Sequence, residues 1–335
     1  GNTTSTAGCS GGGIFSYGGS MSLFDTAFTG NTGHHHGGGV AAWNGGTHQI
    51  SDCHFTGNTT LDSNSTGGGL YLNSCTLTGS DNTFTSNASQ DGGGAWFDSG
   101  VTVNGQLDRW DFIGNSASIE PADGGANHAA GLGLNGMSAI LDDCEFTSNT
   151  SDGYCGGLFI NNTSNCTVQQ CVFTGNTAML TAGAMYIDDT PGVVIQACTF
   201  QQNVAVNFSG AIHLWNSSPT LDTCTITGNQ ASNGGAMYCN GSSVPTVLNS
   251  TVCDNTLEQV YGSFVDIDNC ISDVCDTDGD ESFDCIDGCP NDPDKIAPGV
   301  CGCGIADTDT DSDGTPDCND GCPDDPDKTD PGVCG

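Results

Sequence analysis

The sequence predicts an all-β protein in which a long parallel β-helix is followed by a small, loop-rich module held by disulfides. Three observations support this fold class. A phrase of the form aromatic-Thr-x-Asn returns about every 27 residues, and a run of glycines leads into an apolar residue in many of the same units. Near the C-terminus both phrases stop, and an acidic, cysteine-rich repeat with a longer period replaces them. A fixed period of this kind indicates an array of stacked units.

The repeated phrase defines the length of one coil. Successive Asn positions such as Asn31, Asn58 and Asn87 are nearly evenly spaced, and the one long interval lies between Asn115 and Asn149. Short alternating stretches such as residues 69–72 and 184–187 are separated by Gly, Asn, Ser and Thr, which is typical of short strands joined by turns. We therefore expect about nine to ten coils within residues 1–265, each about 4.8 Å above the last. The copies of the phrase lie at residues 28–31, 55–58, 84–87, 112–115, 146–149, 173–176, 200–203, 226–229 and 252–255.

Each coil is expected to turn its large apolar side chains inward, where they form columns along the axis. The Asn of the phrase is expected at a turn with left-handed backbone, which Asn and Gly tolerate best. Its side chain is expected to hydrogen-bond from coil to coil. Cysteine joins a neighbouring column, because Cys53, Cys144, Cys171, Cys198 and Cys224 each precede the aromatic or aliphatic position by two residues. Pairs such as Cys171–Cys198 or Cys198–Cys224 and a ladder of buried free thiols are both compatible with this spacing.

The composition excludes several classes of partner. The net charge is −37, and Arg109, Lys295 and Lys328 are the three strong cations. Such a surface repels nucleic acid and anionic lipid and attracts divalent cations. Twenty cysteines without zinc spacing indicate an oxidising, extracellular setting, and no apolar run suits membrane insertion. We therefore expect a secreted or cell-surface protein, in which glycosylation sequons occur at Asn58, Asn64, Asn87, Asn149 and Asn249.

The two repeated phrases of residues 1–260 resemble those of a known family. FxxN and GGA[ILV] phrases that alternate in one repeat, as in Phe173–Asn176 and Gly234–Met237, are similar to the repeats of chlamydial polymorphic outer-membrane proteins. More broadly they resemble secreted bacterial right-handed β-helix adhesins. The resemblance implies a right-handed parallel β-helix, display at the cell surface and adhesion.

Residues 266–335 are predicted to form a separate module. Alternate Asp residues on a tight loop direct several carboxylates at one point, and oxygen-only ligands favour Ca²⁺. The spacing resembles thrombospondin type 3 repeats, which bind calcium through DxDxDG-type loops. In the first copy Glu281 stands where the second copy has the turn residue Gly314. The resemblance implies as calcium ligands Asp276, Asp278, Asp280, Asp284 and Asp287 in the first copy and Asp309, Asp311, Asp313, Asp317 and Asp320 in the second.

Residues for catalysis are sparse in the predicted β-helix. A polysaccharide lyase needs a cationic base, and Arg109 is the one strong cation there. A hydrolase needs converging carboxylates. The candidate pairs are Asp142-Asp143 and Asp188-Asp189, and the first of these parallels Asp222-Thr223 in a column that we interpret as turns. We therefore predict no enzymatic activity.

Two further features are candidate binding sites. His34, His35 and His36 are consecutive, so they cannot all face one transition-metal ion from a strand, and we interpret them as a solvated loop. The long interval between Asn115 and Asn149 is the first place to expect a localised ligand site, because insertions in solenoids often carry binding. Its candidate residues are Glu120, Asp123 and His128, with Asp108, Arg109 and Asp111 close in sequence.

The first residues align with the middle of a coil, which has two interpretations. The chain is a piece of a longer protein, or it is a subunit whose end coil is covered by a neighbour. We predict a calcium-stabilised structural or adhesive protein that assembles head-to-tail with copies of itself into an extracellular filament. The alternatives are a monomeric adhesin segment that binds a glycan or a cell-surface protein and, third, a glycan-degrading β-helix enzyme.

Overall fold

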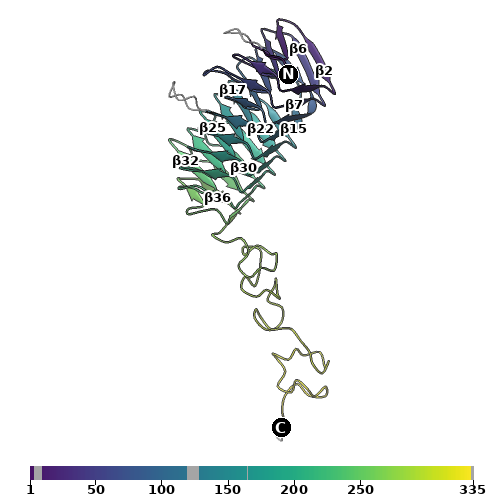
Figure 1. Cartoon of the computed structure of the whole chain (residues 1–335). Helices are drawn as coiled ribbons and strands as arrows, with labels where there is room; N and C mark the ends of the chain where they lie inside the picture. The colour runs from purple at the N-terminus through teal and green to yellow at the C-terminus, as the bar shows by residue number, and fades with distance from the viewer. Residues whose placement is uncertain (4–9, 119–127, 164, 333–335) are drawn as a thin grey trace. The chain divides into compact units, whose positions relative to one another are not determined.

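A computed structural model describes residues 1–3, 10–118, 128–163 and 165–332. The chain divides into two compact units, Gly1–Ile271 and Ser272–Gly335. Within the described residues the first unit is a solenoid of short strands and turns without a helix, and the second contains turns and bends without a strand (Figure 1). The predicted all-β fold class, with a disulfide-bonded C-terminal region, is confirmed.

The strands stack into four sheets in which the paired strands are parallel. The ten-stranded sheet represents about nine turns of the solenoid and consists of β1 (Ile14–Tyr17), β5 (Val40–Trp43), β9 (Leu70–Asn73), β13 (Ala95–Phe97), β17 (Leu132–Asn135), β21 (Leu158–Asn161), β25 (Met185–Asp188), β29 (Ile212–Trp215), β32 (Met237–Asn240) and β35 (Val260–Tyr261). The seven-stranded sheet consists of β4 (Thr32–Gly33), β8 (Thr59–Thr60), β12 (Ala88–Ser89), β16 (Ser116–Ala117), β20 (Thr150–Ser151), β24 (Thr177–Ala178) and β28 (Val204–Ala205).

The remaining strands form a four-stranded and a sixteen-stranded sheet. The four-stranded sheet consists of β2 (Met21–Phe24), β6 (Thr47–Ser51), β10 (Thr76–Thr78) and β14 (Thr102–Val103). In the sixteen-stranded sheet, the long strand β15 (Leu107–Ile113) joins two columns. One column contains β18 (Ile140–Asp142), β22 (Cys166–Gln169), β26 (Val193–Gln196), β30 (Thr220–Asp222), β33 (Thr246–Leu248) and β36 (Val265–Ile267). The other contains β3 (Ala27–Thr29), β7 (His54–Thr56), β11 (Ser80–Thr85), β19 (Glu145–Thr147), β23 (Val172–Thr174), β27 (Thr199–Gln201), β31 (Thr225–Thr227), β34 (Thr251–Cys253) and β37 (Cys270–Ile271).

The aromatic residue of the repeated phrase forms a stacked column inside the solenoid. Phe146 and Phe173, on successive coils, have ring centroids 4.7 Å apart and an interplanar angle of 4°. Phe173 and Phe200 repeat this geometry at 4.7 Å and 6°. Each of these rings is fully buried, so the column removes apolar surface from water and also fixes the registration of neighbouring coils.

The Asn of the phrase forms a continuous buried ladder, as predicted. The backbone N–H and the side-chain Nδ2 of Asn176 both donate to Oδ1 of Asn203, at 3.0 and 2.9 Å. The same Nδ2 donates to the carbonyl of Phe146 at 2.7 Å. Burying an amide is favourable only when its groups are paired, and here every coil supplies the partners of the next.

The expectation that these Asn residues adopt the left-handed backbone is wrong. The residue just before each Asn has positive φ instead, as at Gly175 (φ 62°) and Ser148 (φ 55°). The turn at this preceding residue directs the Asn side chain into the solenoid, where it joins the ladder. The predicted turn column is confirmed at Asp52, Asp143 and Thr223, which have φ of 54°, 53° and 56° and each precede a column cysteine.

The predicted cysteine column lies inside the solenoid as free thiols, so the ladder interpretation is the one that the structure adopts. Cys144, Cys171, Cys198 and Cys224 are almost fully buried. Burial raises the pKa of the Cys224 thiol to about 12. The Cys224 thiol is therefore protonated at neutral pH, and all four thiols are shielded from water and pack as small apolar groups.

The sequon asparagines fall into two classes. Asn58, Asn87 and Asn149 are fully buried members of the ladder, so their side-chain amides are not available for glycosylation in the folded state. Asn64 and Asn249 are exposed.

Replacing one ladder residue tests the contribution of the ladder. We expect Asn176→Ala to lower the free energy of unfolding by about 3 kcal/mol or more, because the buried amide and carbonyl groups of Asn149, Asn203 and Phe146 lose partners. Urea unfolding followed by circular dichroism measures this change. The control is Asn64→Ala at an exposed position, expected to change the midpoint little. Equal midpoints for the two variants would contradict a stabilising ladder.

Candidate functional site

The outer face of the ten-stranded sheet carries a second column of aromatic side chains. Strand pairing places Phe159 beside Tyr186, Tyr186 beside His213, and His213 beside Tyr238. Further along, Gly133 pairs with Trp96, and a Cβ at position 133 would clash with the indole ring. Glycine there allows the Trp96 ring to lie over the neighbouring strand and approach Phe159, at 6.1 Å between centroids. The outer column is therefore packed, and loops cover part of it.

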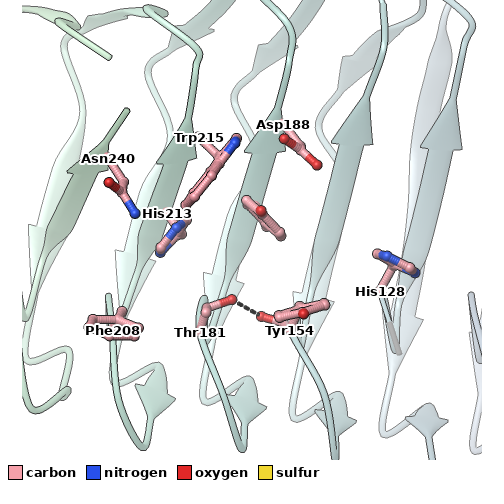
Figure 2. A pocket seen from close by; sticks show the side chains of 9 residues that line it. His128, Tyr154, Thr181, Asp188, Phe208, His213, Trp215 and Asn240 are labelled. Atoms are coloured by element: carbon pink, nitrogen blue, oxygen red, sulfur yellow. Dashed lines mark hydrogen bonds between the residues drawn. The ribbon is translucent and has the colours of Figure 1, made fainter. Parts of the chain in front are cut away.

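Part of this outer column forms the floor of a groove. One wall consists of Asp188, Trp215 and Asn240, the last residues of β25, β29 and β32. The other wall comes from the loops that lead into the strands and includes Tyr154 and Phe208. The groove has a volume of about 410 Å³, and Figure 2 shows the two walls with His213 between them and His128 at one end. The lining residues are His128, Tyr154, Thr181, Tyr186, Asp188, Phe208, His213, Trp215 and Asn240.

The walls of the groove are held in place by contacts between coils. Thr181 Oγ1 donates to the carbonyl of Tyr154 at 2.8 Å and ties two successive loops together (Figure 2). On the floor, the rings of Tyr186 and His213 meet edge to face at 4.9 Å. The ring of Phe208 lies 6.3 Å from His213. The groove is thus preformed by the fold, as binding sites for small molecules usually are.

The groove contains one carboxylate and two histidines among its described lining residues. Burial lowers the pKa of His213 to about 4, so this ring is neutral at physiological pH. Burial and the neighbouring Asp189 raise the pKa of Asp188 above its ordinary value of 3.8. His128 Nδ1 lies 3.2 Å from Asp91 Oδ1. Asp188 is therefore the negative charge of this groove at neutral pH.

The paired carboxylates considered for hydrolysis do not converge here. Asp188 lines the groove, whereas Asp189 is exposed on a turn with φ of 45°. Asp142 accepts a hydrogen bond from Gln106 Nε2 at 2.9 Å, and Asp143 belongs to the turn column. Neither of these last two residues lines the groove.

Arg109, the cation considered for lyase chemistry, is occupied by ion pairs. Its Nε donates to Asp81 Oδ1 at 2.6 Å, its Nη2 donates to Asp81 Oδ2 at 3.1 Å, and its Nη1 contacts Asp108. These carboxylates raise the pKa of the guanidinium further, so Arg109 stays charged and cannot accept a proton.

The long interval between Asn115 and Asn149 contributes one described residue, His128, to the groove. Glu120 and Asp123, its two acidic candidates, lie outside the described residues. Asp111 is on β15, where burial and Glu145 raise its pKa, and it does not line the groove. The sequence thus indicated one end of the groove but missed its aromatic lining. The signal was present, because an aromatic residue recurs at the second position of several strands that follow the glycine runs.

The three consecutive histidines do not converge on one point. His35 Nδ1 and His34 Nδ1 lie 3.1 and 3.7 Å from Asp62 Oδ2. His36 faces elsewhere: it stacks on Tyr71 at 4.5 Å and is hydrogen-bonded to Thr66. Among the described residues, the groups of side chains placed to hold a metal ion are two Asp triads in the second unit.

The first Asp triad is Asp276, Asp278 and Asp280, whose carboxylate oxygens lie within 4.8 Å of one another. All three accept hydrogen bonds from the loop backbone: Asp276 with both oxygens, and Asp278 and Asp280 with one each, as where Asp280 Oδ1 accepts from Ser282 N at 2.8 Å. The second oxygens of Asp278 and Asp280, and that of Asp287, are buried without a hydrogen-bond partner. Unpaired buried carboxylate oxygens are costly, so this donor set suits a hard cation.

The second triad, Asp309, Asp311 and Asp313, has the same geometry in the second repeat. Gly314 N donates to Asp309 Oδ2 at 3.0 Å, as Glu281 N donates to Asp276 Oδ2 at 2.9 Å. Here the buried oxygens without a partner are those of Asp311 and Asp320. Oxygen-only ligands on a tight loop are the kind that Ca²⁺ takes.

Asp284 and Asp317, two of the ten predicted ligands, accept hydrogen bonds within their own loops. Asp284 accepts hydrogen bonds from the N–H and the hydroxyl of Thr277, at 2.8 and 2.6 Å. Asp317 does the same with Thr310. These bonds lower the pKa of Asp317 and close each loop. Glu281 adopts φ of 74°, close to that of a glycine turn, so the first loop keeps the geometry of the second.

Disulfides connect the turns of the second unit. Cys289 pairs with Cys303, and Cys301 pairs with Cys318, which links the first repeat to the second. Cys275 and Cys285 of this unit are also disulfide-bonded, as are Cys253 and Cys270 in the last coils of the first unit. In a unit without described strands, such bonds replace a large apolar core. Disulfides of this number are typical of extracellular proteins.

Comparison with known proteins agrees with the observed solenoid. The model of a family described as right handed beta helix region matches residues 111–271 and, in an overlapping match, residues 156–312. The two matches together span more than half of the chain, and the chain belongs to this family. No curated protein and no solved structure matches it significantly. Among the described residues there is no helix with the length and apolarity to cross a membrane. Because one fold hosts many activities, family membership leaves enzymatic activity open.

The raised pKa of Asp188 predicts a stability cost at the groove. The folded state holds the proton more tightly than the unfolded chain, so the ionised carboxylate destabilises the fold at pH values above its folded-state pKa. We expect Asp188→Asn to raise the midpoint of urea unfolding at neutral pH. The gain should shrink as the pH falls through the raised folded-state pKa and should be lost below 3.8, the ordinary value for Asp. The exposed Asp152→Asn is the control. A lower midpoint for Asp188→Asn at neutral pH would contradict the prediction.

Proposed function

We propose that this protein is an extracellular adhesive protein that binds a glycan chain in the groove of its β-helix. The observation that carries this proposal is the combination of aromatic rings and hydrogen-bonding side chains along one open trough. The apolar faces of sugar rings pack against aromatic rings, while Asp188, Asn240 and Thr181 offer hydrogen-bonding groups for hydroxyls. The walls draw on several successive coils, each about 4.8 Å from the next, which favours an elongated ligand parallel to the axis.

The groove favours binding over the other roles predicted from the sequence. The groove lies on the lateral surface of the solenoid, whereas assembly into a head-to-tail filament depends on contact surfaces at the two end coils. A glycosidase needs two carboxylates that flank the scissile bond, and Asp188 is the one carboxylate among the described lining residues. We therefore assign retention of a glycan, and not its cleavage, to this face.

Calcium is assigned to the second unit as a structural ion. The two Asp loops resemble thrombospondin type 3 repeats in spacing, and their buried, unpaired oxygens support the assignment. Asp276, Asp278, Asp280 and Asp287 would hold one ion, and Asp309, Asp311, Asp313 and Asp320 the other. Such ions neutralise the clustered charge and rigidify loops that have few apolar contacts.

The calcium assignment predicts a measurable loss in a single variant. We expect Asp311→Asn to lower the affinity of the second loop for Ca²⁺ by about tenfold or more, because one ligand charge is lost. Isothermal titration of the chelator-treated protein measures it. Asp327→Asn, an exposed acidic residue of the same repeat, is the matched control. No calcium binding by the wild-type chain, or equal affinities for the two variants, would refute the assignment.

The glycan proposal is tested with one aromatic residue of the wall. We expect Trp215→Ala to weaken binding to a retained polysaccharide by about tenfold or more, because a stacking surface is removed. Affinity electrophoresis through gels that contain a panel of neutral and amino-sugar polysaccharides identifies the ligand. Tyr17→Ala is the control, since Tyr17 is 65% exposed and lies on β1, away from the groove. Absence of retardation by every polysaccharide would exclude the proposed function.

A further inference from the structure

Among the described residues of the groove, the carboxylate of Asp188 has no Lys or Arg partner. Of the three strong cations of the chain, Arg109 is paired with Asp81 and Asp108, and Lys295 and Lys328 belong to the second unit. Among the described residues, no side chain donates a hydrogen bond to the carboxylate of Asp188; the backbone N–H of Asp189 contacts it, and His128 lies near enough to interact with its charge. His213 is neutral at physiological pH and supplies no compensating charge. A half-buried carboxylate is thus kept among aromatic rings with no Lys or Arg beside it, and His128 is the nearby group that interacts favourably with its charge.

The surroundings of Asp188 match the requirements of a cation. Asp188 and Tyr186 are two residues apart on β25, so both side chains leave the same outer face of the strand. Trp215 is the strand-pairing partner of Asp188 on the next coil. A positive group at this position lies beside a carboxylate and two aromatic side chains, whose rings attract cations through their quadrupoles. An ammonium group therefore gains both an ion pair and cation–π contacts here.

We propose that the groove selects a glycan with free amino groups, whose ammonium lies against Asp188 between Tyr186 and Trp215. This inference rests on the proposed glycan-binding function and names the chemistry of its ligand. Uronic acids and sulfated sugars are rejected, because a second anion would meet Asp188 and the net charge of −37. A glycan is favoured over a lysine side chain of a protein, because the groove extends along several coils and has aromatic rings on both the floor and the walls.

The test compares short oligomers of glucosamine and of N-acetylglucosamine of equal length. They share ring size and linkage and differ in the charge of the amine. Titration calorimetry is carried out at about pH 6 and about 0.15 M salt, where the amine is largely protonated and long-range attraction is screened. We expect the wild-type protein to bind the glucosamine oligomer about tenfold more tightly.

The acidic surface as a whole attracts any polycation, so the decisive comparison is between two single-charge variants. The Asp188→Asn variant is expected to bind the two oligomers with about equal affinity, so that the preference for the free amine is lost. Asp189→Asn removes the same charge from the exposed neighbouring residue and is expected to keep the preference within about twofold of wild type. If both variants change the preference equally, the attraction is general and the inference fails.

The remaining outcomes separate this inference from the proposed function. Equal affinity of the wild-type protein for the two oligomers, with both lost in Trp215→Ala, would overturn the amine preference and retain the groove as a glycan site. Tighter, Asp188-dependent binding of a lysine oligomer of the same length would assign the groove to a basic peptide and overturn the inference. Binding of neither oligomer, together with no retardation in any polysaccharide gel, would overturn both.

Discussion

Every coil of the first unit depends on the coils above and below it for its hydrogen bonds. No coil has a closed set of backbone or side-chain partners of its own, and the buried Asn ladder makes this dependence explicit, because each Asn uses the oxygen of the next. The ladder also tolerates variation in the length of the coil. Asn115 and Asn149 are 34 residues apart, yet their hydrogen bond of 2.9 Å equals that of coils 27 residues long. Registration is therefore set at a few buried positions, while the rest of the coil is free to vary.

This registration produces the groove as well as the core. Stacking places equivalent residues of successive coils side by side on the outside of the ten-stranded sheet, just as it does on the inside. On the inside the column stays apolar from coil to coil, as Leu158, Met185 and Ile212 show. On the outside the column changes from Tyr186 to His213, and the wall beside it changes from Asp188 to Trp215 and Asn240. A solenoid thus builds a site by changing one exposed residue per coil while the stacking of the coils stays the same. The stacked core below the groove stabilises the fold enough to tolerate the destabilising carboxylate of Asp188.

The second unit is stabilised by a different set of interactions. Its described residues form no sheet, and its apolar side chains Ile286, Ile296 and Val300 are largely exposed. Disulfides and Asp-capped turns stabilise this unit in place of an apolar core. The clustered carboxylates repel one another, which favours the binding of cations. One chain therefore combines a fold stabilised by repetition with one stabilised by covalent and ionic links.

The period of the repeated phrase determined the β-helix, its inward Phe and Cys columns and the Asn ladder, because a single local pattern recurs with a period that matches one coil. The Asp spacing of the second unit likewise predicted which carboxylates gather. The tertiary structure alone decided the rest. It placed the left-handed residue before each Asn, left the column thiols unpaired, and brought Tyr154, Asp188 and Trp215 together. Those outcomes depend on which side chains meet across successive coils, and that contact is set by the three-dimensional stacking and not by any local pattern.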